Sequence, residues 1–514
     1  MGTFYVTTPI YYANDFPHIG SAYTTVAADV LARYHRRRGD STFFLTGTDE
    51  HGAKVAEAAA QQGLEPKAFA DRIAAGFQDA WRSLNISNDY FIRTTDPRHE
   101  AGVQAFLQAL FDRGEIYRGK YEGLYCVGCE AYVAPEDLAD GLCPVHRRPP
   151  IVYSEDNYFF RLSKYGAVLQ RAITNPTDPN FYQIGPATRR NEVLGRLRGG
   201  LADISISRAA LTWGIPLPFD PSQTAYVWID ALLNYITAAG YHDDQETFRR
   251  LWPGVNLIGK DILWFHAVIW PAMLIAAGVR PPKLVYAHGF FTINGQKMSK
   301  SLGNVIVPSE LIDRFGVDGA RYLLASEFPF GVDGDVSIPS FIARYNAELA
   351  NDLGNLLNRT VSMINRYWFG EVPDPGERTD HLDDELEARA NRTVSEYFER
   401  IEALDFPGTV VAIRDLVARA NRYVEETAPW TLAKSDRVRL ASVLYSLGEC
   451  LRLIAELIWP FMPGAAEAMV EQLGTTLAAE GWQSGVLGWG HLPVGARVTR
   501  PLPLFPRIEP PVAG

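Results

Sequence analysis

The segment 4–45, FYVTTPIYYANDFPHIGSAYTTVAADVLARYHRRRGDSTFFL, decides the fold of this chain. It begins with an extended stretch at 4–8 and a turn at Pro9. Apolar residues then recur at helical spacing, namely Val26, Val30, Leu31 and Tyr34. Gly39 ends this helix, and the apolar run 43–45 follows as a strand. The pattern predicts a βαβ unit, in which ligands bind beyond the carboxyl ends of the strands and helix N-termini present N–H groups to phosphate.

A second unit of the same kind occurs much later in the chain. Residues 257–259 read as a strand, 262–277 as a helix and 284–287 as the next strand. The predicted fold is therefore an α/β fold with a Rossmann-like parallel sheet that an insertion divides. From about residue 342 strand signals fade, and leucines at helical spacing begin a helical bundle: Leu349, Leu353, Leu356 and Leu357.

These patterns divide the chain into five expected regions. They are the first half of the α/β domain (1–115), a small inserted domain (116–218), the second half of the α/β domain (219–303), a linking region (304–350) and a helical domain with a C-terminal tail (351–514).

Composition excludes several classes of protein. With 47% hydrophobic and 21% charged residues in 514, the chain resembles ordinary folded domains and is too long for one core. A net charge of −11 argues against non-specific nucleic-acid binding, although a local basic face remains compatible with it. The N-terminal segment lacks a basic start followed by an apolar core, and the apolar stretches at 262–279 and 453–462 are interrupted or short. We therefore expect a cytoplasmic protein without a membrane partner.

Two short motifs fall at the predicted nucleotide site. His18-Ile19-Gly20-Ser21 lies at the start of the first helix, where a glycine lets a nucleotide approach the backbone. Lys297-Met298-Ser299-Lys300-Ser301, between Gly295 and Gly303, carries two ammonium groups on a loop that could close over a pyrophosphate. Each motif alone is weak, because short patterns recur by chance and a bare basic loop explains the second. Their order on two halves of one nucleotide fold favours a shared site.

The two motifs resemble the signature sequences of the class I aminoacyl-tRNA synthetases. Four further segments are similar, in the same order, to segments of methionyl-tRNA synthetases: PIYYAN at 9–14, TGTDEHG at 46–52, YVWIDA at 226–231 and GKDILWFH at 259–266. The likeness runs from about residue 4 to residue 506. It implies a class I Rossmann-like catalytic domain split by a zinc-binding insertion and followed by an α-helical bundle that binds the anticodon.

The activity implied by the resemblance has two steps. L-methionine and ATP, with Mg²⁺, form methionyl-adenylate and pyrophosphate. The methionine is then transferred to the terminal ribose, at its 2′ position, of tRNA(Met), including the initiator tRNA. No side-chain nucleophile is required, because such chemistry depends on positioning and on positive charge near the phosphate oxygens.

The resemblance also implies roles for individual residues. Catalysis is assigned to His18, Lys297 and Lys300, and to Ser21, which stands where the family usually has a second histidine. A serine hydroxyl donates a hydrogen bond but cannot carry charge, so we expect Ser21 to contribute least. The implied ATP-binding set is His18, Gly20, Ser21, Gly259, Asp261, Lys297, Met298 and Lys300.

A methionine pocket should be aromatic with one or two donors, because a thioether is a weak acceptor in an apolar chain. The matching residues are Ile10, Tyr12, Asp49, Trp228, Ala231, Tyr235, Phe265 and His266. The family match gives Asp49 the substrate ammonium group. The plainer alternatives are core aromatics and, for Asp49, a partner of a helix dipole.

Three of the four cysteines cluster in the insertion. Cys126-x-x-Cys129 and Cys143-x-x-His146 have the spacing of a closed tetrahedral zinc site with three thiolates and one imidazole. Four protein ligands leave no open position, so the predicted zinc is structural. The alternative is unrelated buried cysteines and a surface histidine. Cys450 has an apolar helical context and is expected in the core.

The helical bundle offers candidate tRNA contacts. Asn355 and Arg359 are four apart on a predicted helix and share a face, and Trp430 could stack on an anticodon base. Solvent-facing polar residues and a core tryptophan are the plain alternatives, and the resemblance places all three on the anticodon-reading surface.

Two rivals remain open. One is a class I synthetase for isoleucine, valine, leucine or cysteine, although the insertion is short and metal-binding and does not resemble a large editing domain. The other is a non-catalytic tRNA-binding protein. The presence of the four expected substrate-binding and catalytic residues argues against it: His18, Asp49, Lys297 and Lys300. The turn-rich tail after Gly485 shows no further domain, so we expect a monomer.

Overall fold

The structure is a computed structural model that describes residues 2–126, 131–133, 135–144, 147–209, 211–293, 295–298, 303–377 and 380–509. Its centre is a seven-stranded sheet in the order β2-β3-β1-β13-β14-β8, with β4 also paired to β3, and every pairing is parallel. The strands are β1 (Thr3–Thr7), β2 (Tyr11–Tyr12), β3 (Ser41–Asp49), β4 (Tyr90–Arg93), β8 (Gln183–Gly185), β13 (Val255–Gly259) and β14 (Leu284–His288). Both predicted βαβ units are therefore confirmed, and they meet where β1 pairs with β13.

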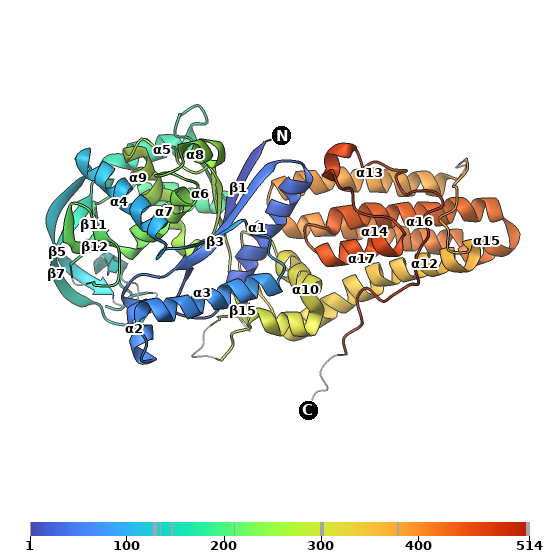
Figure 1. Ribbon diagram of the computed structural model, residues 1–514, viewed down its shortest axis with the longest axis horizontal. Coiled ribbons are helices and arrows are strands. Elements are labelled where there is room, and N and C mark those ends of the chain that lie inside the picture. Colours follow the sequence, from blue (N-terminus) through green and yellow to red (C-terminus); the bar gives the residue numbers. More distant parts are fainter. Residues whose placement is uncertain are drawn as a thin grey trace.

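Alternating side chains of the central strands enter two separate cores, as the pleat of a strand requires. Val6, Phe44 and Leu257 pack on one face of the sheet, and the residues next to them along each strand pack on the other face. The first face is covered by α1 (Ile19–Arg37), α3 (Pro66–Ser83) and α10 (Pro308–Ser326), the second by α4 (Pro97–Asp112), α7 (Val227–Thr237) and α9 (Trp270–Ala276). The short helices α2 (Ala53–Gln61) and α8 (Gln245–Leu251) complete the domain (Figure 1).

The predicted helix at 262–277 is a run of three helical types. A 3₁₀ turn at Lys260–Ile262 leads to a π-helical turn at Phe265–Ile269 and then to α9. Pro271 stands in the first turn of α9, directly after the π-helical turn. The wide turn lies beside the cavity described below and carries His266.

The insertion contains its own sheets but also adds to the central one. β5 (Ile116–Cys126), β6 (Ala131–Val133), β7 (Ile151–Phe160) and β9 (Ile204–Ser205) form a sheet in the order β6-β5-β7-β9. β10 (Ser207–Arg208), β11 (Pro216–Leu217) and β12 (Asp220–Ala225) form another, and short 3₁₀ turns lie at Pro135–Asp137 and Leu162–Tyr165.

The helices α5 (Gly166–Thr174) and α6 (Ala187–Leu197) flank β8, which pairs with β14 in the central sheet. The expectation that 116–218 forms a separate domain thus differs from the structure at β8. The three-residue strand was too short to register as a period-2 pattern, and it pairs with the otherwise open edge of β14.

The chain then crosses to the helical bundle through a short sheet of β15 (Phe291–Ile293), β16 (Gln296–Lys297) and β17 (Gly334–Asp335). After α10, α11 (Ile338–Arg344) and a π-helical stretch at Tyr345–Gly354 lead into the bundle. Its helices are α12 (Asn355–Trp368), α13 (His381–Glu402), α14 (Phe406–Thr427), α15 (Pro429–Ser435), α16 (Arg437–Ile458) and α17 (Pro463–Gln472), with a 3₁₀ turn at Gly481–Ser484.

The bundle extends away from the sheet along the long axis of the molecule (Figure 1). Its core is continuous with the core on the α1 face of the sheet. At the junction the buried guanidinium of Arg321 donates to the carboxylate of Asp29 at 2.6 Å and to the carbonyl of Phe461 at 2.9 Å. In the described part of the chain, no helix is long and apolar enough to span a membrane.

Candidate active site

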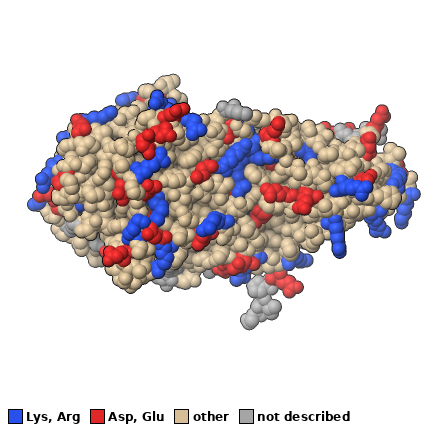
Figure 2. All heavy atoms as spheres, in the orientation of Figure 1, with Lys and Arg blue, Asp and Glu red and all other residues tan. Residues whose placement is uncertain are grey.

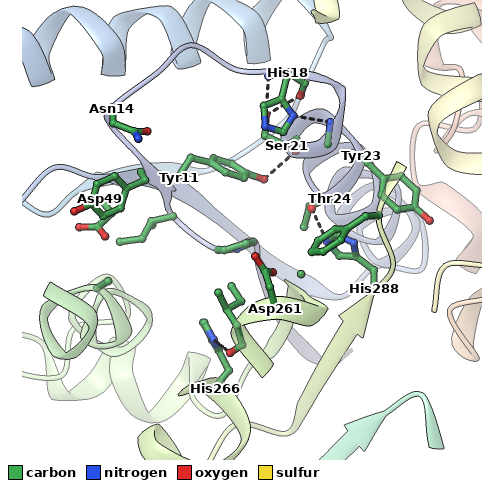
Figure 3. A pocket seen from close by; sticks show the side chains of 18 of the residues that line it. Tyr11, Asn14, His18, Ser21, Tyr23, Thr24, Asp49, Asp261, His266 and His288 are labelled. Atoms are coloured by element: carbon green, nitrogen blue, oxygen red, sulfur yellow. Dashed lines mark hydrogen bonds between the residues drawn. The ribbon is translucent and has the colours of Figure 1, made fainter. Parts of the chain in front are cut away.

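A cavity of about 450 Å³ opens at the carboxyl ends of the central strands. Figure 3 shows Asp49, His18, His288 and His266 around this hollow. Of the predicted substrate residues, those that line it are Ile10, Tyr12, His18, Gly20, Ser21, Asp49, Trp228, Ala231, Tyr235, Gly259, Asp261, His266 and Met298. Both halves of the divided fold therefore contribute to one site, as the sheet order requires.

Three predicted residues are not among those described as lining the cavity. Phe265 is not in the lining and instead stacks on Trp228, with ring centroids 4.2 Å apart and planes 10° apart. Lys297 ends β16, and its side chain lies outside what the structure describes. Lys300 also lies outside the described residues.

His18 caps the helix that its motif begins. It is the N-cap residue of α1, in extended backbone conformation, and its Nδ1 accepts the N–H of Gly20 at 3.0 Å. This bond places the proton of a neutral ring on Nε2. A β-carbon added at Gly20 would stand 2.8 Å from the His18 ring, so only glycine allows the close approach. The helix N-terminus and the imidazole together favour an anion at this end of the cavity.

The opposite wall is aromatic. The Nδ1–H of His266 donates to the carbonyl of Ile262 at 3.0 Å, so its Nε2 accepts the hydroxyl of Tyr235 at 2.8 Å. Burial lowers the pKa of His266 to about 4, and the ring is therefore neutral near pH 7. Because both ring nitrogens are engaged, His266 orients Tyr235 and presents ring surface to the cavity.

Asp49 is positioned by strand pairing. It is the last residue of β3, opposite Tyr12 of β2, and its carbonyl accepts the N–H of Ala13 at 2.7 Å. The side chain is buried at the carboxyl end of the strand and lines the cavity. A carboxylate in this place can bind a substrate ammonium group.

Sequence reasoning missed several lining residues. The most informative is His288, whose Nε2 pairs with the hydroxyl of Thr24 at 2.6 Å and whose Nδ1–H donates to the carbonyl of Gly289 at 2.7 Å. Burial lowers the pKa of His288 to about 4. Its place as the last residue of β14 was the available signal, because ligand-facing residues gather at such strand ends. Tyr11, Asn14, Tyr23 and Lys54 also line the cavity.

The predicted zinc ligands are only partly described. Cys126 ends β5 and pairs with Ala131 of β6, and the N–H of Cys143 donates to the carbonyl of Arg148 at 2.9 Å. Both cysteines are buried, as thiolate ligands of a closed site would be. Cys129 and His146 lie outside the described residues. Within the described ranges no group of three or more His, Cys, Asp or Glu side chains could hold a metal ion.

The predicted tRNA residues lie on the bundle. Asn355, at the start of α12, is exposed, and Arg359 one turn later forms an ion pair with Glu425 of α14 at 2.6 Å. Trp430 is the second residue of α15 and has 42% of its surface exposed, so it is not a core residue. Lys and Arg side chains gather at this end of the bundle (Figure 2), where Arg422, Lys434 and Arg437 are exposed.

Both the α/β part and the helical part of the chain match known proteins. Residues 4–147 and 126–361 match the family model of class I tRNA synthetases (M), and residues 372–511 match the anticodon binding domain of methionyl tRNA ligase. A methionine–tRNA ligase of Caldanaerobacter subterraneus is 48% identical, over 99% of this chain and 79% of the relative. One of Streptomyces coelicolor is 46% identical, over 98% of this chain and 97% of the relative. Among solved structures, Mycobacterium tuberculosis methionyl-tRNA synthetase in complex with methionyl-adenylate superposes with a TM-score of 0.94 and 41% identity, over 99% of this chain and 100% of that one.

Proposed function

The chain belongs to the methionyl-tRNA synthetases of class I, and we propose on this basis that its cavity holds ATP and methionine together. The activity follows from the family: methionine and ATP give methionyl-adenylate and pyrophosphate, and the methionine is then joined to tRNA. The chain's own residues determine how each substrate is held.

ATP is proposed to lie with its phosphates toward the N-terminus of α1. The Nε2–H of His18 would offer a donor there, the N-terminus of α1 favours negative charge, and Gly20 leaves the space that a side chain would fill. The chain reaches this place again through Met298, which lines the same cavity. Lys297 and Lys300, on either side of Met298, would supply positive charge to the oxygens of the α-phosphate and of the departing pyrophosphate. Mg²⁺ accompanies the ATP.

Methionine is proposed to lie between Asp49 and the aromatic wall. Its ammonium group would pair with the Asp49 carboxylate, which leaves its own carboxylate free to attack the α-phosphorus. Its thioether would pack on Trp228 and Tyr235, since soft sulfur contacts aromatic rings favourably. Neutral His266 accepts the hydrogen bond of the Tyr235 hydroxyl, so the methionine sulfur would meet no charged group on this wall.

The substrate that enters in the second step is proposed to be tRNA(Met), including the initiator tRNA. Asn355, Arg359 and Trp430 would read unpaired anticodon bases at the basic end of the bundle. We propose that the enzyme works as a monomer in the cytoplasm. We also propose that Cys126, Cys129, Cys143 and His146 hold a zinc ion, which would stabilise the fold of the insertion and take no part in catalysis.

The observation that carries this proposal is one cavity lined by the first-motif residues His18 and Gly20, by Met298 and by the aromatic wall. The experiment is amino-acid-dependent exchange between ATP and pyrophosphate, run in parallel with methionine, isoleucine, valine, leucine and cysteine. Only methionine should support rapid exchange. Exchange with another amino acid, or none with any, would contradict the proposed substrate.

A further inference from the structure

Behind the aromatic wall lies a buried cluster that the proposed mechanism does not use. The carboxylate of Asp230 accepts the Nδ1–H of His51 at 2.7 Å through one oxygen and the Nε2–H of His99 at 2.7 Å through the other. The other ring nitrogen of His99 pairs with the hydroxyl of Thr237 at 2.7 Å. The side chains of Asp230, His51 and His99 are 1%, 4% and 1% exposed, so water does not weaken these bonds.

The cluster joins the two sides of the proposed methionine site. Asp230 belongs to α7, where its neighbours Trp228 and Ala231 line the cavity while Asp230 itself does not. His51 follows Asp49 by two residues in the turn between β3 and α2. His99 belongs to α4, which packs against α7. A single carboxylate therefore connects the turn that follows the ammonium-binding residue, the helix that carries the wall, and the helix behind it.

The turn itself is held by further contacts that leave it little freedom. The N–H of Gly52 donates to the carbonyl of Trp213 at 3.0 Å, and the indole N–H of Trp213 donates to the carbonyl of Glu50 at 2.6 Å. Gly52 has a φ of 102°, and a β-carbon there would stand 2.5 Å from the hydroxyl of Tyr12. The segment from Asp49 to Gly52 is therefore fixed relative to both the cavity and α7.

From this arrangement we propose that Asp230, His51 and His99 are positioning residues that set the spacing between Asp49 and the Trp228 wall, and thereby the affinity for methionine. The inference rests on the proposed function, because it assigns methionine to this part of the cavity. None of the three residues touches the place proposed for ATP. Loss of the cluster should therefore affect one substrate and leave the other almost unchanged.

The test is the KM for each substrate in ATP–pyrophosphate exchange, with the full-length chain and the variants Asp230→Asn, Asp230→Ala and His51→Gln. In Asp230→Asn and His51→Gln we expect the KM for methionine to rise about tenfold and the KM for ATP to change less than about twofold, since a distorted subsite loses only the binding made there. Asp230→Ala should be worse than Asp230→Asn, because an amide still fills the space and accepts one histidine N–H.

A matched control separates positioning from general stability. Asp383 is equally buried in the bundle and binds Tyr423, Arg439 and Ser442, far from the cavity. Asp383→Asn should lower the melting temperature without changing either KM. His51→Gln decides the question if the Asp230 variants do not fold.

Two results would overturn the positioning role, provided that the wild type shows methionine-dependent exchange. One is an unchanged KM for methionine in folded His51→Gln, and the other is an equal rise in the KM values for methionine and for ATP. Absence of methionine-dependent exchange in the wild type would instead refute the proposed function.

Discussion

The hydroxyl of Ser21 binds the backbone of His18 twice, accepting its N–H at 3.1 Å and donating to its carbonyl at 2.7 Å. The first of these bonds is the Ser21 half of a capping box at the start of α1. Ser21 is also largely buried, although it touches the lining of the cavity. The serine at the position of the family's usual second histidine thus helps to hold the first histidine in place.

Ser21→Ala should lower both stability and the rate of activation, but only modestly. Loss of the hydrogen bonds between the Ser21 hydroxyl and the His18 backbone should cost about 0.5–1.5 kcal/mol, and His18 would keep its bond to the N–H of Gly20. In the proposed mechanism Lys300→Ala would remove a positive charge from the transition state, and it should slow activation far more. Thermal denaturation and single-turnover adenylate formation measure the two effects. Equal losses of rate in the two variants would contradict this ranking.

His266→Ala should weaken methionine binding and leave ATP binding largely intact. The variant leaves the buried hydroxyl of Tyr235 without its acceptor and opens a gap in the wall, which together cost about 2–4 kcal/mol if no water enters. Tyr235→Phe should show a smaller loss of the same kind. Tyr182→Phe is the matched control, since its buried hydroxyl donates to the carbonyl of Ala267 outside the lining. Isothermal titration with each substrate distinguishes this outcome from an equal loss of both affinities, which would indicate a folding defect.

The buried histidines should make stability depend on pH in two opposite ways. Burial lowers the pKa of His266 and of His288 to about 4, so the unfolded chain binds more protons than the native one between about pH 4 and 6.5, and stability rises with pH across that window.

The contribution of His51 to stability depends on pH in the opposite direction. Burial alone lowers its pKa, but the charges of Asp230 on α7, Glu100 on α4 and the adjacent Glu50 outweigh burial, and the net pKa is raised above its ordinary value. His99, also on α4, faces the same carboxylate.

The stabilising contribution of His51 is therefore complete below about pH 6.5 and is lost as pH rises through its raised pKa. Melting temperatures from pH 4 to 9 should pass through a maximum, and His51→Gln should flatten only the alkaline side. A variant curve that declines as steeply as the wild type above neutrality would show that His51 does not titrate as described.

Trp430→Ala should impair aminoacylation of tRNA far more than adenylate formation. Stacking of an aromatic ring on a base is worth about 1–3 kcal/mol, which corresponds to roughly a 5- to 140-fold loss in kcat/KM for tRNA. Glu425→Gln, which frees Arg359 from its ion pair, should change the KM for tRNA without changing exchange. If exchange and aminoacylation decline to a similar extent in Trp430→Ala, the residue stabilises the bundle and does not contact RNA.

Freshly purified protein should contain about one zinc ion per chain, bound by the cysteines and histidine of the insertion. Cys143→Ser should abolish the metal and lower stability. Cys450→Ser provides the control, because Cys450 is equally buried but lies in α16. Elemental analysis of the three proteins is the measurement, and zinc retained in full by Cys143→Ser would exclude the predicted ligand set.

Residues close together in the sequence were predictable because their pattern is local. The helical spacing of Val26 and Val30 predicted α1, and the glycine and histidine of the first motif predicted the character of its N-terminus. The strand β8 was not predictable, because three residues carry no usable period. The cluster of His51 and Asp230 was also missed, since 179 residues separate the two side chains and neither motif hints at the other.

The sequence alone determined the divided α/β fold, the helical bundle and the residue types needed for adenylate chemistry, since periodicity and motif order are written in neighbouring residues. Only the tertiary structure decided which side chains meet: that Ser21 supports His18, that His266 engages both its nitrogens, and that Asp230 joins the turn after Asp49 to α7. The physical reason is that parallel strands bring distant segments to one sheet edge, where packing and burial set the contacts and the pKa values that no local pattern records.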